Sequence, residues 1–197
     1  MEGRIAQVLS LALVAALAAG CGPTAAARFY TLDATATAGD APAVRTTVLV
    51  GPVSVPSAVD QPQFVVQIAP NRVEIEEFNR WAAPLSEGIA RAVAADLSAL
   101  LGTPDVAAGS LTNFTPAYRV TIDIQRFDSV LGKEVVVDAV WAVRKTAGGQ
   151  VHPGRTVARE ALQGEGFDAL AAAHSRALVK LSGDIAVAIR AANAGVR

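Results

Sequence analysis

A strict alternation of apolar and polar residues over 118–125 constrains the fold of this chain more than any other feature. The apolar positions are Tyr118, Val120, Ile122 and Ile124, and the polar ones are Arg119, Thr121, Asp123 and Gln125. Period two is typical of a β-strand with one buried and one solvated face. Phe127 has the opposite parity, which predicts a β-bulge near Arg126. Further strands are predicted over 134–144 and 154–162, so these neighbours form an antiparallel meander.

The residues before this meander predict shorter and less regular strands. The runs rich in aromatic and β-branched residues are 28–32, 48–55, 64–68 and 72–75. Residues 33–46 between the first two runs have no periodicity and read as a loop or linker. Gly51-Pro52 interrupts the second run, and because proline lacks the ladder N–H we expect an edge or a bulge there. The last two runs form a hairpin that turns at Asn71.

Two amphipathic helices are expected, one before the meander and one after it. Pro84 opens the first helix and Gly102 ends it, with Asp96 off the apolar stripe. Its stripe is Leu85, Ile89, Val93 and Leu97, and that of the second helix is Leu170, His174, Leu178, Leu181, Ile185 and Ile189. The second helix begins near Asp168. The expected fold class is α+β, a curved, mainly antiparallel β-sheet with two amphipathic helices packed on one face.

Composition and charge exclude several classes of protein. Lys plus Arg total 17 and Asp plus Glu total 18, so the formal net charge is −1 and the basic surplus of a nucleic-acid binder is missing. One Cys excludes an intramolecular disulfide. Together with only two His, it also excludes a four-ligand Cys/His zinc site. We therefore expect no nucleic-acid partner and no metal.

The first twenty residues are typical of a secretory signal. Arg4 precedes an apolar stretch of fifteen residues, 5–19, which only Gln7 and Ser10 interrupt. A membrane-spanning helix needs about 20 apolar residues, so this stretch fits the h-region of a signal peptide. It ends in small residues directly before Cys21, the only cysteine. The junction resembles the bacterial lipobox, whose cysteine becomes the acylated first residue after cleavage.

A lipid on Cys21 divides the chain into three segments. Residues 1–20 are the lipoprotein signal peptide, 21–46 are a lipidated tether with a short strand and linker, and 47–197 are the α+β domain. Acyl chains contribute about 0.8 kcal/mol per buried CH₂, so a multiply acylated cysteine anchors the chain firmly. Enteric-type bacteria retain lipoproteins with Asp after the cysteine in the inner membrane, so Gly22 favours the outer membrane. The alternative is a plain signal peptide with an incidental cysteine.

No group of residues in the sequence nominates a catalytic site. The G-x-S-x-G, P-loop and H-E-x-x-H motifs are absent. His152 is expected in an exposed loop. His174 is expected to be a core histidine satisfied by a backbone carbonyl, with a packing or partner role as the alternative. Glu74 and Glu76 share one strand face and, with Glu77, are interpreted as a solvated edge.

Four short motifs in chain order carry a resemblance to a known family. They are Gly51-Pro52-Val53-Ser54-Val55-Pro56, Asp60-Gln61-Pro62-Gln63, Asn71-Arg72-Val73-Glu74 and Phe78-Asn79-Arg80-Trp81-Ala82-Ala83-Pro84-Leu85. This order resembles the PqiC-like family, also called ABC-type transport auxiliary lipoproteins. The lipobox, the strand that begins at Tyr118 and the last helix fit the family as well. Val59 stands where the family often has Leu, and Ala83 where it often has Glu.

The resemblance implies a non-catalytic lipoprotein of the outer membrane that faces the periplasm. Its implied partners are an MCE-domain protein and an inner-membrane ABC permease and ATPase, which together move lipids or other hydrophobic molecules. The protein would dock the periplasmic components at the membrane. The alternative is a periplasmic module that itself carries the transported molecule. No cofactor is implied apart from the covalent lipid on Cys21.

Eight residues are candidates for contact with a partner protein. They are Gly51, Pro52, Pro56, Asp60, Pro62, Asn71, Trp81 and Pro84. Trp81 is interpreted as a core or near-core residue, and an exposed aromatic anchor is the alternative. A sheet edge near Gly51 could accept a strand from a second copy of the chain, which would build a homo-oligomer.

Overall fold

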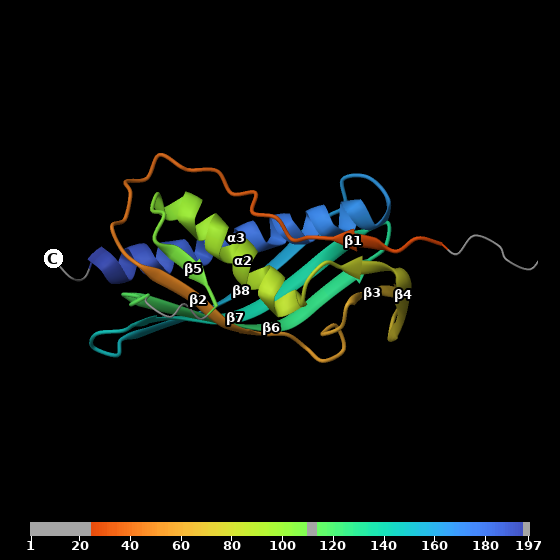
Figure 1. Cartoon of the computed structure of the whole chain (residues 1–197), viewed down its shortest axis with the longest axis horizontal. Helices are drawn as coiled ribbons and strands as arrows, with labels where there is room; N and C mark the ends of the chain where they lie inside the picture. Colours follow the sequence, from red (N-terminus) through yellow and green to blue (C-terminus); the bar gives the residue numbers. More distant parts are fainter. Residues whose placement is uncertain (1–24, 110–113, 195–197) are drawn as a thin grey trace, which may run out of the picture.

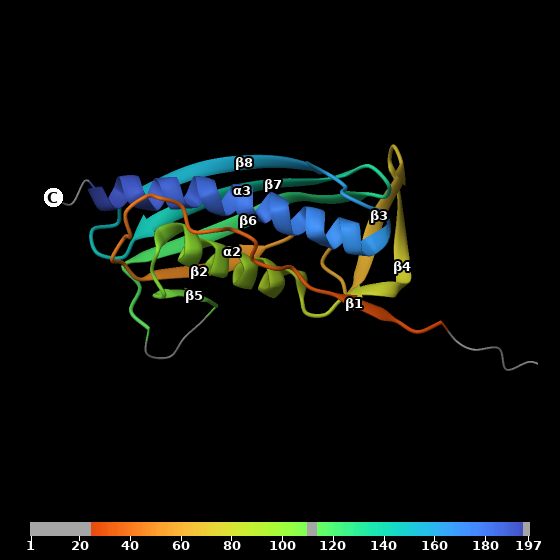
Figure 2. The same ribbon diagram turned by 90° about the horizontal axis from the view of Figure 1, so that it is seen from above.

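A computed structural model describes residues 25–109 and 114–194 of the chain, so Cys21 and the signal segment lie outside the described residues. These residues form an eight-stranded mixed sheet and two helices. The strands are β1 (Arg28–Tyr30), β2 (Val48–Ser54), β3 (Gln63–Ala69), β4 (Arg72–Trp81), β5 (Val106–Ala108), β6 (Tyr118–Val130), β7 (Glu134–Lys145) and β8 (Val151–Ala161). The helices are α2 (Leu85–Leu101) and α3 (Gly166–Ala194). Both cover the same face of the sheet (Figures 1 and 2), which confirms the expected fold class.

The meander consists of β6, β7 and β8, the three longest strands of the sheet. The antiparallel pairings of β7 with β6 and β8 run almost the full length of these strands. The other edge of β6 pairs in parallel with β2 and, at Ser129 and Val130, with β3. Beyond β2 the sheet ends in β5, and beyond β3 it continues through β4 to β1. The expected bulge in β6 is confirmed, because the register shifts between Ile124 and Arg126.

The interruption at Gly51-Pro52 is a bulge. The pairing of β2 with β6 shifts between Val50 and Val53, and the Gly51–Pro52 peptide bond is cis. The backbone φ of Gly51 is 132°, a value that residues other than glycine rarely adopt. The alternative of an edge strand is wrong over 48–50, because β5 and β6 flank β2 there. Strand β5 was not expected from the sequence.

Both helices begin close to the expected residues, and α2 also ends where expected. Pro84 occupies the N-cap of α2, and Gly102 closes it in the left-handed conformation with φ 67°. In α3 the apolar stripe lies on the sheet, as its fully buried leucines and isoleucines show. Neither of the two described helices is long and apolar enough to cross a membrane.

The structure corrects the expected positions of two polar residues. Asp96 is fully buried rather than on a solvated face, because residues 35 and 36 cover its carboxylate. They belong to the segment after β1, which runs along the helices (Figure 1). Its carboxylate accepts hydrogen bonds from the backbone N–H groups of Thr35 and Ala36 and from the Ser182 hydroxyl. Burial raises the pKa of Asp96 from its usual value. His152 lies in strand β8 opposite Val143, and not in a loop.

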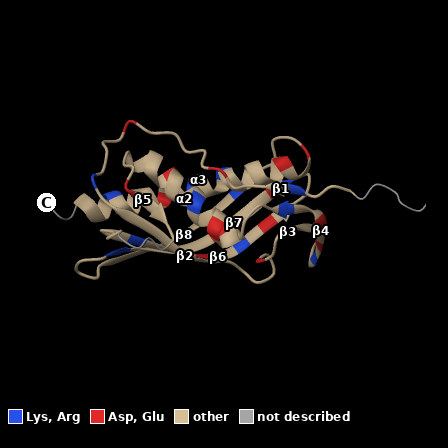
Figure 3. Ribbon diagram, viewed as in Figure 1, with Lys and Arg blue, Asp and Glu red and all other residues tan. Residues whose placement is uncertain are grey.

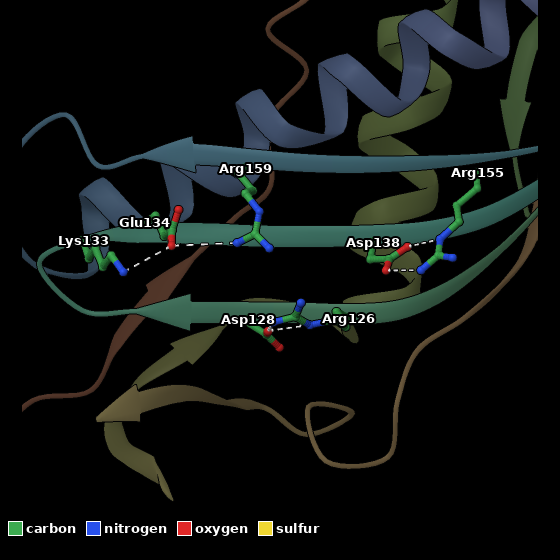
Figure 4. Close-up of polar contacts among 7 residues, drawn as sticks. All are labelled: Arg126, Asp128, Lys133, Glu134, Asp138, Arg155 and Arg159. Carbon is green, nitrogen blue, oxygen red and sulfur yellow. Dashed lines mark hydrogen bonds and ion pairs between the residues drawn. The ribbon is translucent and has the colours of Figure 1, made fainter. Parts of the chain in front are cut away.

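The sheet face opposite the helices carries a series of ion pairs. Figure 3 shows basic and acidic residues interspersed along the strands and helices. In Figure 4, Arg126 pairs with Asp128, Arg155 with Asp138, and both Lys133 and Arg159 with Glu134. The Arg155 guanidinium donates two hydrogen bonds to Asp138, of 2.9 and 2.7 Å, and lowers the pKa of that carboxyl. The pairs of Arg155 with Asp138 and of Arg159 with Glu134 join β8 to β7, whereas Arg126 and Asp128 lie on one strand.

We predict that Gly154→Ala lowers the free energy of unfolding by about 1–3 kcal/mol, a typical cost of overpacking. A Cβ at Gly154 would overlap the indole of Trp141 on the neighbouring strand. The ring cannot move aside easily, since its Nε1–H donates to the Thr156 hydroxyl over 3.0 Å and that hydroxyl donates to Asp184. Denaturant unfolding measures the loss. Gly183→Ala in α3 is the matched control, because nothing apart from the neighbouring backbone of its own helix lies within 4 Å of the added Cβ. Equal losses in the two variants would contradict the overlap.

Candidate partner-binding surface

Four of the eight candidate contact residues meet around one hollow of about 380 Å³. Its lining residues are Asp60, Gln61, Pro62, Trp81, Ala82, Ala83, Pro84 and Leu85. They come from two segments, the turn before β3 and the connection from β4 to α2. The antiparallel hairpin of β3 and β4 explains the meeting, because its open end brings the start of one strand beside the end of the other.

Backbone hydrogen bonds hold the two segments in place. The carbonyl of Pro56 accepts from the N–H groups of Val59 and Asp60, at 3.0 and 3.1 Å, and so closes the turn. The Trp81 N–H donates to the Pro62 carbonyl over 2.6 Å, which ties the turn to the end of β4. Pro56 is therefore a structural residue of the turn and does not line the hollow.

Trp81 is a core residue whose edge reaches the hollow. It is 7% exposed and stacks on Phe64, with ring centroids 4.1 Å apart. Tyr30 contacts the same Phe64 edge-on at 5.3 Å, and Phe127 contacts Trp81 edge-on at 6.1 Å. This aromatic cluster fixes the wall of the hollow on the rigid part of the fold.

His174 packs against the cluster, and no catalytic arrangement of described residues surrounds it. It is fully buried, its ring stacks on Phe127 at 3.9 Å, and its Nε2 lies 2.8 Å from the Ser129 hydroxyl. The expected backbone carbonyl partner is thus wrong, since a side-chain hydroxyl takes its place. Burial lowers the pKa of His174 to about 3, so the ring is neutral at ordinary pH. Within 25–109 and 114–194, no carboxylate hydrogen-bonds to this ring.

The remaining candidate residues are distributed over other parts of the surface. Gly51 and Pro52 line a second hollow, also of about 380 Å³, between β2 and the first turns of α2. A third hollow of about 240 Å³ shares Trp81, Ala83 and Leu85 with the first and Arg91 with the second. We call the residues around these three hollows the α2 entry surface. Asn71 is remote from it, at the tip of the hairpin, with φ 62°.

Sequence reasoning missed the contribution of β1 to this surface. Residues 30–33 line the third hollow, because β1 pairs in parallel with the last three residues of β4. The Ala82 N–H donates to the Tyr30 carbonyl over 2.8 Å. Parallel pairing between distant segments leaves no local signal in the sequence. Among the described residues, no group of three His, Cys, Asp or Glu side chains could hold a metal ion.

The fold and the α2 entry surface define a small α+β domain whose candidate site is a contact surface on an open sheet. The chain belongs to the family of ABC-type transport auxiliary lipoprotein components, whose model matches residues 30–186. This confirms the resemblance seen in the motifs. The protein is therefore an auxiliary lipoprotein component of an ABC-type transport system, and its lipoprotein class implies membrane anchoring.

Solved structures share the fold at low sequence identity. A crystal structure of an uncharacterised protein has a TM-score of 0.69 and 21% identity, and the match covers 84% of this chain and 99% of that one. A protein from Xanthomonas campestris has a TM-score of 0.67 and 19% identity, with 81% and 93% of the two chains covered. A search of curated proteins found no match.

Proposed function

We propose that the protein is a non-catalytic outer-membrane lipoprotein that docks the periplasmic components of an MCE/ABC-type envelope transport system. Its lipid on Cys21 anchors it, and an MCE-domain protein, linked to an inner-membrane ABC permease and ATPase, is its partner. The family match over residues 30–186 supports the link to ABC-type transport. The transported molecule is a lipid or another hydrophobic compound.

The observation that carries the docking role is the position of the α2 entry surface. It lies beside β1, through the pairing of Tyr30 with Trp81. Tyr30 follows Cys21 by nine residues, so a lipid on Cys21 would hold this surface near the bilayer. Prolines and the buried aromatic cluster restrict the motion of this surface, and a preorganised surface binds partners with a smaller loss of conformational entropy.

Charge reversal at this surface tests the docking role. We expect Asp60→Arg to reduce co-purification of the MCE-domain protein by about tenfold, a typical effect near the centre of an interface. The matched control is Asp105→Arg, at an aspartate next to β5 that is likewise exposed. Both lipidated variants are extracted from membranes of cells that make the whole system. Capture at the wild-type level by Asp60→Arg would contradict a docking role for this surface.

Removal of the lipid-bearing thiol tests the anchor. We expect Cys21→Ser to move the protein from the outer-membrane fraction to the soluble fraction, because no acyl chain remains to enter the bilayer. Its circular dichroism spectrum stays that of the folded domain, since the sheet and helices of the described residues begin only at Arg28. A variant that still sediments with the outer membrane would contradict the anchor.

The buried side chains between the sheet and the helices give no support to the alternative of a lipid-carrying module. Leucine, isoleucine and valine side chains from both layers join one continuous core there. Mass spectrometry of organic extracts of the purified protein distinguishes the two roles. Near-stoichiometric bound lipid beyond the covalent anchor would favour the carrier.

A further inference from the structure

Strand β4 has its apolar face turned away from the helices. In the antiparallel pair with β3, Glu74 lies opposite Val66, whose side chain is 1% exposed and belongs to the core. Paired residues share a sheet face, so Glu74 is on the helix side. Val73 and Ile75 have the opposite parity and lie on the other face. This is the reverse of an ordinary half-buried strand, in which the apolar face packs on the core.

The same face continues onto β1. Tyr30 pairs with Trp81, and both side chains are in the core on the helix side. Phe29 and its partner Arg80 therefore lie on the face away from the helices. The exposed fractions are 64% for Phe29, 59% for Val73 and 55% for Ile75. We call these three residues the apolar wing face.

The apolar wing face lies at the end of the molecule where the tether joins the domain. Figures 1 and 2 show β1, β3 and β4 together at one end, and α3 running toward the other. Six residues, 22–27, separate Cys21 from Arg28. A chain spans at most about 3.6 Å per residue, so Cys21 lies within about 25 Å of Arg28.

We propose that the apolar wing face rests on the phospholipid surface of the bilayer that holds the Cys21 lipid. This inference depends on the lipid anchor of the proposed function. The short tether keeps Phe29 within reach of the headgroups, where exposed aromatic and aliphatic side chains insert and arginine meets phosphate. Arg80 lies on the same face, whereas Glu74 is on the opposite one, away from the lipid phosphates. The contact would fix the orientation in which the α2 entry surface meets its partner.

Fluorescence quenching on vesicles tests the orientation. The full lipidated protein is reconstituted in vesicles of phosphatidylethanolamine and phosphatidylglycerol that contain spin-labelled lipid. A fluorophore is attached through Val73→Cys in one sample and through Val187→Cys in the other. Both valines are highly exposed, at 59% and 68%, but Val187 lies on α3. The thiol of Cys21 carries the lipid and does not compete for the label.

We expect the label at position 73 to lose most of its fluorescence to the spin-labelled lipid and the label at 187 to keep nearly all of it. Equal quenching at the two positions would overturn the proposal. A label at 73 that is unquenched by lipid but shifts with protein density would assign the face to a second copy of the chain, and would overturn it as well. Flotation of the vesicles distinguishes a failure of the lipid anchor from a failure of this inference. A protein that does not float with the vesicles contradicts the lipid anchor, whereas a floating protein with an unquenched label at 73 contradicts this inference alone.

Discussion

Trp81→Ala is expected to lower the free energy of unfolding by about 3–5 kcal/mol, the usual cost of removing a buried large aromatic side chain. The indole stacks on Phe64 and contacts Phe127 and His174 edge-on, so its removal leaves a cavity in the middle of the aromatic cluster. It also removes one wall of the first hollow of the α2 entry surface. Denaturant unfolding of the wild type and the variant measures the loss.

Trp81→Phe is the matched control for this substitution. A phenyl ring keeps most of the stacking on Phe64 and fills part of the space, so we expect a loss of about 1–2 kcal/mol. If Trp81→Ala unfolds at the denaturant concentration of the wild type, Trp81 is a surface anchor and not part of the core. Partner binding by Trp81→Phe then separates the packing role of the ring from a direct contact.

The stability of the domain is expected to fall as the pH drops from about 6.5 toward 3, because His174 is buried in its neutral form. Burial lowers the pKa of His174 from 6.5 to about 3 in the folded state. Below pH 6.5 the unfolded chain binds a proton at this position that the folded chain does not, so acid favours unfolding. The difference corresponds to about 2 kcal/mol at pH 5, at 1.36 kcal/mol per pH unit. Above pH 6.5 the contribution is constant.

His174→Gln isolates this effect from other titrations. Glutamine is neutral at every pH and can still reach the Ser129 hydroxyl, but it cannot stack on Phe127 as a ring does. We expect the variant to be less stable than the wild type at pH 7 and to lose much less stability between pH 7 and pH 5. Parallel curves of unfolding free energy against pH for the two proteins would contradict the neutral buried histidine. The raised pKa of Asp96 and the lowered pKa of Asp138 act alike in the wild type and the variant, so they cancel in this comparison.

The elements that the sequence predicts are those with a local periodic signal. The alternation over 118–125, the meander and both helices depend on spacing within one segment, and the structure reproduces them. Burial of Asp96 could not be predicted in this way, because its cover comes from residues 35 and 36, far away in the sequence. Strand β5 has only three residues, too few for a periodic pattern.

The candidate surface was predictable in part for a similar reason. Pro62 directly precedes β3 and Trp81 is the last residue of β4, so a correct hairpin prediction brings them together. Tyr30 joins them through a parallel pair with the distant end of β4, which no local pattern reveals. The stacking of His174 on Phe127 likewise depends on how α3 lies on the sheet. Its position in the apolar stripe predicted burial, but not the Ser129 partner.

Photocrosslinking in native membranes tests the docking role most directly. A photoreactive amino acid replaces Asp60 in one strain and Asp105 in another, both in cells that make the complete transport system. We predict a covalent adduct with an MCE-domain protein from position 60, identified by mass spectrometry, and none from position 105. Illumination that yields no such adduct at position 60, or equal adducts at both positions, would contradict a docking subunit that meets its partner through the α2 entry surface.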